Sequence, residues 1–62
     1  MNKKELKNLA KKIAECERII QSSNDKEEIA RAKNQELYYS SKLGSLEDML
    51  VVDEMVQKFL DN

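Results

Sequence analysis

The side chains of this chain that could do chemistry are few and poorly arranged for catalysis. Histidine is absent, and Cys16 is the only cysteine among 62 residues. A nucleophilic thiol needs a basic neighbour that favours the thiolate, whereas the residues beside Cys16 are Glu15 and Glu17. We therefore interpret Cys16 as a small buried side chain. The sequence predicts no catalytic residue and no enzymatic activity.

Carboxylates are numerous, and several occur as adjacent pairs. These pairs are Glu27/Glu28, Glu47/Asp48 and Asp53/Glu54. Carboxylates act as acid and base, or bind a cation, only where they converge in one pocket. Neighbouring residues of a helix point about 100° apart instead. A closed zinc site needs about four Cys or His ligands. We therefore predict no metal site and no cofactor.

The composition favours helices, because the chain has no proline, one glycine and 37% charged residues. Apolar residues from Leu6 to Ile20 recur at spacings of three and four, as in a coiled coil. This pattern predicts a helix over about 3–21. Capping residues at 22–25 then start a second helix over about 25–43, and a third follows over about 46–60. We predict a single all-α domain, 1–62, folded as a small bundle of three helices whose first and third members run parallel.

Gly44 leaves one alternative open. Glycine is favoured just past the end of a helix, and Ser45 has the chemistry of a helix N-cap. A helix that continued through Gly44 would cost about 1 kcal/mol relative to alanine. It would make the chain a long two-helix antiparallel hairpin. Both arrangements leave apolar surface uncovered, and both predict an oligomer.

The third predicted helix carries more apolar surface than one helix needs. Its apolar positions cover roughly 200° of the helix circumference, so it must be central in its domain or covered by another chain. A chain this short buries only about 60% of its surface on folding. Without a disulfide or a metal, oligomerisation is the remaining source of stability, and we predict a homodimer. The predicted interface consists of Met49, Val52, Met55, Val56, Phe59 and Leu60.

The net charge of −1 hides an asymmetry between the two ends of the chain. Residues 1–12 hold five lysines and one glutamate, a charge of +4, and residues 45–62 hold five acidic residues and one lysine, a charge of −4. Parallel first and third helices would bring these ends together. An acidic residue within the apolar arc must also pair with a lysine or mark a contact with another chain. The residues predicted to pair are Lys3, Lys4, Lys7 and Asp53.

These features predict a non-enzymatic protein–protein interaction module that self-associates and binds a larger protein through its apolar C-terminal helix. Small adaptors, inhibitors and accessory subunits of bacteria or phages are of this type. The alternative is a nucleic-acid-associated protein that uses the lysine-rich N-terminal helix, although the chain is acidic overall. No apolar run suits a signal peptide or a membrane helix, and a lone cysteine fits a reducing compartment. We therefore predict a cytoplasmic protein without a membrane partner.

Overall fold

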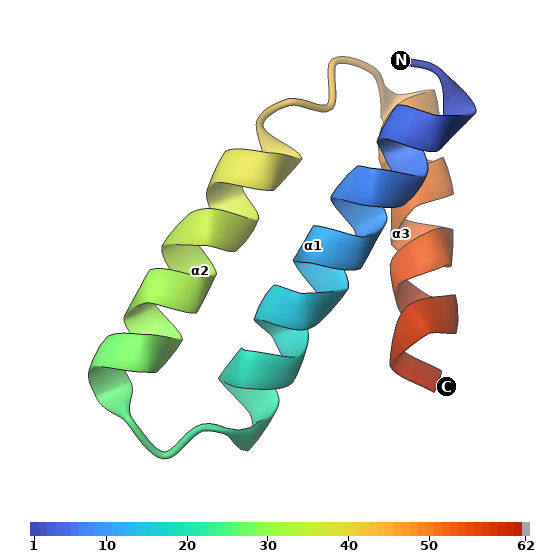
Figure 1. Ribbon diagram of the computed structural model, residues 1–62. Coiled ribbons are helices and arrows are strands. Elements are labelled where there is room, and N and C mark those ends of the chain that lie inside the picture. The colour runs from blue at the N-terminus through green and yellow to red at the C-terminus, as the bar shows by residue number, and fades with distance from the viewer. Residues whose placement is uncertain (62) are drawn as a thin grey trace.

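The computed structural model describes residues 1–61. It consists of three helices, α1 (Lys3–Ser22), α2 (Lys26–Ser40) and α3 (Leu46–Asp61) (Figure 1). The first two form an antiparallel hairpin, and α3 returns along the other side of α1 in the same general direction as α1 (Figure 1). The predicted all-α architecture of three helices is confirmed.

Each helix begins beside a polar side chain that binds a free amide of the first turn. The Asn2 side chain accepts a hydrogen bond from the Glu5 amide at 2.9 Å. Asp25 and Ser45 accept equivalent bonds at the starts of α2 and α3, at 3.0 and 3.1 Å. Because the first amides of a helix have no partner within it, these caps set where each helix starts.

The connection between α2 and α3 corrects two predictions. The second helix ends at Ser40, three residues before the predicted boundary, because the Ser41 hydroxyl donates to the Tyr38 carbonyl at 2.6 Å and the chain turns. Leu43 then folds back against the core. The long continuous hairpin is therefore wrong. Gly44 does not adopt the left-handed conformation expected just past a helix end, since its φ is not positive.

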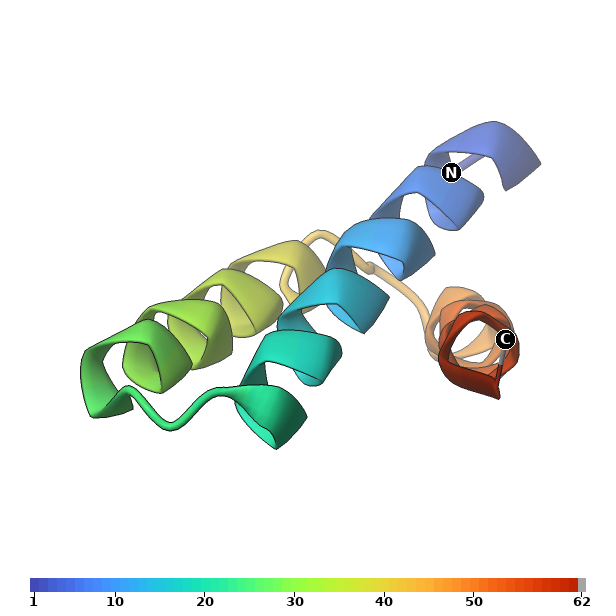
Figure 2. The ribbon, with the colours of Figure 1, turned by 60° about the horizontal axis from the view of Figure 1, so that its bottom comes forward.

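The central helix is α1, so α3 does not take the first of the two positions predicted for it, the centre of the domain. The second, cover by another chain, stays a prediction. Figures 1 and 2 show α2 and α3 on opposite flanks of α1, with α3 crossing it obliquely. Both helices pack on α1 and make at most marginal contact with each other. Six of the nine buried core residues belong to α1. The nine are Leu6, Leu9, Ala10, Ile13, Ala14, Cys16, Ala32, Val52 and Val56.

Small side chains of α1, and a hydrogen bond from α1 to the last turn of α3, hold α3 against α1. Ala10 and Ala14 are almost completely buried and share one cluster with Val52 and Val56 of α3. Near the other end of the contact, the Arg18 guanidinium donates to the Phe59 carbonyl. That carbonyl lies in the last turn of α3, where carbonyls lack helical partners and a cation suits the helix dipole. One side of α3 is thus fixed on α1, and the rest of its surface stays uncovered.

Candidate functional site

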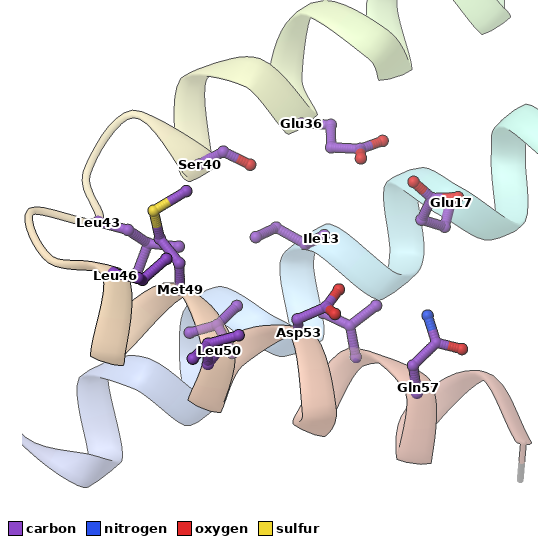
Figure 3. Close-up of a pocket in the computed structure, with 12 residues that line it drawn as sticks. Ile13, Glu17, Glu36, Ser40, Leu43, Leu46, Met49, Leu50, Asp53 and Gln57 are labelled. Carbon is purple, nitrogen blue, oxygen red and sulfur yellow. The ribbon is translucent and has the colours of Figure 1, made fainter.

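A groove lies between α2 and α3, and α1 forms its floor. Because the two flanking helices stand apart on α1, the space above that helix is open to solvent and measures about 430 Å³. Figure 3 shows the groove from its open side. Its lining comes from all three helices and the connection before α3. The lining residues are Ile13, Glu17, Glu36, Ser40, Leu43, Leu46, Met49, Leu50, Val52, Asp53, Val56 and Gln57.

One end of the groove is apolar. Leu46 and Leu50 of α3 are 71% and 63% exposed, and Met49 beside them is 49% exposed. Positions spaced three and four apart share one face of a helix, so the start of α3 at Leu46 places these side chains together. Leu43 completes this end from the connection (Figure 3). We call Leu46, Met49 and Leu50 the exposed face of α3.

The opposite end of the groove is acidic. Glu17 of α1 and Glu36 of α2 point their carboxyl groups toward each other, and Asp53 of α3 lines the groove apart from this pair, nearer its middle (Figure 3). Burial, followed by a hydrogen bond to Glu17 and the charge of Glu17, raises the pKa of Glu36 from 4.5 to about 7. A neighbouring negative charge disfavours the ionisation of a carboxyl group, and no described residue supplies a cation to Glu36 within ion-pair distance.

The predicted interface residues have different positions in the structure. Val52 and Val56 are buried against α1, and three others of the six predicted residues are partly buried on the same core, so the chain itself covers most of the predicted interface. Of that set only Met49 is exposed, and Leu46 and Leu50, which lie outside the set, are exposed as well. All of these residues lie within the broad apolar arc. The width of the arc indicated that α3 has more apolar surface than one contact covers. It did not indicate which part of α3 faces α1. The three partly buried residues are Met55, Phe59 and Leu60.

The predicted charge pairing has no direct counterpart in the contacts of residues 1–61. Lys3, Lys4 and Lys7 are exposed, and Asp53 is an exposed groove residue without a lysine partner. The ion pair that the structure does form joins the α-amino group of Met1 to Asp48 across 3.7 Å. Asp53 was expected among apolar neighbours because it lies in the arc of α3. The groove admits water to that part of the arc, so the carboxylate needs no buried partner.

Cys16 is buried, as its place in the seam predicts. It is 3% exposed, and its Sγ atom lies 4.0 Å from the Gln35 side-chain oxygen. Burial and then the charge of Glu36, with smaller effects of the flanking glutamates, raise the pKa of the thiol. A raised pKa disfavours the reactive thiolate. Cys16 therefore serves as a packing residue between α1 and α2.

Other kinds of site are not evident in residues 1–61. Those residues contain no cluster of three His, Cys, Asp or Glu side chains able to hold a metal ion. Within the same range, none of the helices has the length and apolar character needed to cross a membrane. The chain matches no protein-family model, no curated protein and no solved structure.

The carboxyl pair makes stability depend on pH. Because the folded chain holds the Glu36 proton more tightly than the unfolded chain, the contribution of Glu36 to stability is fully present below about pH 4.5 and is lost as the pH rises through about 7. Glu36→Gln removes this titration. It should raise the free energy of unfolding at pH 8 by about 1 kcal/mol, a value reduced for solvent screening in the open groove, and leave it little changed at pH 4.

Thermal melts at several pH values measure this effect. Glu28→Gln is the matched control, because Glu28 is exposed on the same helix and does not line the groove. It should keep the wild-type pH dependence. An unchanged pH dependence in Glu36→Gln would show that the two carboxyl groups do not interact in solution.

Proposed function

We propose that this protein is a non-enzymatic protein–protein interaction module that binds its partners through the exposed face of α3. The observation that supports the proposal is the exposure of Leu46, Met49 and Leu50 on one rim of a groove. Single exposed apolar residues are ordinary on protein surfaces. Neighbouring ones beside a concave surface are typical of sites that accept an amphipathic helix. An adaptor, an inhibitor or an accessory subunit acting in the cytoplasm would have this design.

Self-association is part of the proposal. The same face is available on every copy, and a second copy would remove three large apolar side chains from water. Each square ångström of apolar surface buried contributes about 25 cal/mol, set against the loss of translational and rotational freedom. We expect a homodimer that forms through the groove side of α3 and competes with any other partner of that surface.

Sedimentation equilibrium tests the self-association. The expected result is a weight-average mass that rises from 7.2 kDa toward twice that value as the concentration increases. If the chain stayed monomeric at every concentration up to about 100 µM, the dissociation constant of the dimer would lie well above 100 µM. That result would contradict this part of the proposal.

One observation supports a second candidate, nucleic-acid binding by the N-terminal half of α1. Its lysines are exposed, and no carboxylate of residues 1–61 lies within ion-pair distance of them. They are Lys3, Lys4, Lys7, Lys11 and Lys12. Phosphate contacts make affinity fall steeply with salt. A salt titration of binding to double-stranded and to single-stranded nucleic acid therefore distinguishes this candidate from protein binding. If the protein bound neither form, nucleic-acid binding would be excluded.

A further inference from the structure

The groove is apolar at one end and acidic at the other, and this polarity selects its occupant. Leu46 and Asp53 are seven residues apart on α3, about 10 Å along the helix axis at 1.5 Å per residue. Figure 3 shows the apolar side chains toward one end and Glu17, Glu36, Asp53 and Gln57 toward the other. An occupant that lies along the groove therefore contacts apolar side chains first and carboxylates about two turns later.

We propose that the groove binds an amphipathic helix of another protein, one that carries leucine-like side chains on one turn and lysine or arginine about two turns further along the same face. The inference rests on the proposed function and specifies the chemistry of the partner. The apolar turn covers Leu46, Met49 and Leu50, and the basic turn lies over Glu17, Glu36 and Asp53. Helices laid into apolar grooves are a recurring mode of recognition between proteins.

Charge distinguishes this partner from a second copy. An isologous dimer places the same surface of both copies in contact, so pairing through the groove would put six carboxyl groups, three from each copy, into one interface without adding a basic residue. Like charges in an interface weaken it. A basic turn would instead supply the cation that the close Glu17–Glu36 pair lacks among the described residues. We therefore infer that a basic helix binds more tightly than a second copy near neutral pH.

The two occupants also respond to pH in opposite directions. The groups that face Glu36 are Glu17 and Cys16 of α1, with Asp53 across the groove. A basic helix favours the ionised carboxylates, so its binding releases a proton and its affinity rises between pH 5 and pH 8. A second copy favours the protonated carboxyl group, and self-association weakens over the same range.

The probe for this inference is a capped synthetic helix with three leucines on one turn, two lysines two turns later on the same face, and alanines elsewhere. The control peptide has glutamates in place of the lysines. Fluorescence anisotropy of the labelled peptides measures binding to the intact chain. We expect the lysine peptide to bind at least about tenfold more tightly than the glutamate peptide, because charge-assisted hydrogen bonds are made only by the former.

Two pairs of substitutions test whether the groove carboxylates are responsible. The double variant Glu36→Gln with Asp53→Asn should weaken binding of the lysine peptide by about tenfold or more. The matched pair, Glu47→Gln with Glu54→Gln, also removes two carboxyl groups, from exposed positions of α3 outside the groove, and should change the affinity less than about twofold.

Three results would overturn the inference. They are no binding of the lysine peptide, equal binding of the two peptides, or equal losses in the two double variants. If the lysine peptide does not bind but the chain self-associates in a Leu50-dependent way, the partner chemistry is wrong and the proposed function stands. If the chain neither self-associates nor binds either peptide, both are wrong.

Discussion

Val52→Asp is expected to release α3 from α1 and to unfold most of the chain. Val52 is 3% exposed and shares a cluster with Ala10 and Ala14 of α1. A carboxylate placed there loses its hydration without gaining a partner, at a cost of several kcal/mol. Small domains have only about 0.05–0.15 kcal/mol of stability per residue. The substitution therefore removes most or all of the stability.

Circular dichroism and a thermal melt of Val52→Asp test this expectation. Gln57→Asp is the control, since Gln57 is exposed on the same helix and the change should alter the free energy of unfolding by less than about 0.5 kcal/mol. If Val52→Asp melted as the wild type does, α3 would not be docked on α1 by this face. The division of α3 into a buried and an exposed side would then be wrong.

Leu50→Asp should have the opposite effect, loss of association with the fold retained. The side chain is 63% exposed, so a carboxylate there stays hydrated in the monomer. In an interface built on the exposed face of α3 it would be buried without a partner, at a cost of several kcal/mol. We expect self-association to weaken by at least about tenfold, with unchanged helicity.

Leu37→Asp is the matched control for this prediction. Leu37 is 69% exposed on α2 and does not line the groove, so the two variants introduce the same charge at equally exposed leucines. Light scattering of both variants compares them directly. A loss of association in Leu37→Asp but not in Leu50→Asp would move the contact surface from α3 to the outer side of α2.

Local chemistry made the helices predictable. The capping side chains at Asn24–Asp25 and at Ser45 mark helix starts that depend on neighbouring residues alone. The end of α2 was harder to place, because it depends on a hydroxyl that turns back to a carbonyl of the preceding turn and on the contact of Leu43 with the core. Neither interaction has a distinct sequence pattern.

The position of α3 could not be predicted from its own pattern. A helical wheel gives the angles of Leu46, Val52 and Leu50 relative to one another, but not the direction of α1. That direction follows from Ala10 and Ala14, whose small size lets α3 approach closely. Two alanines among the larger apolar side chains of α1 were the sequence signal for this contact. Such small residues indicate the helix against which the others pack.

The acidic end of the groove depends on the register of the hairpin. Glu17 and Glu36 are 19 positions apart in the sequence and meet because α1 and α2 run antiparallel. The two residues lie at unequal distances from the turn at 23–25, Glu17 six positions before it and Glu36 eleven positions after it. The position of the turn therefore does not identify the pair by itself, because the offset between the two packed helices also decides which residues meet.

The central claim is that the exposed face of α3 is the surface through which this protein associates. Dilution of uniformly ¹⁵N-labelled protein, from about 1 mM to about 10 µM, tests it most directly, because amide shifts report each residue that enters or leaves an interface over this range of affinity. The predicted result is that the shifts which change with concentration belong to Leu46, Met49, Leu50 and Asp53, while those of Leu37 and Tyr38 stay constant. Concentration-independent shifts throughout α3, or changes confined to Leu37 and Tyr38, would contradict the claim.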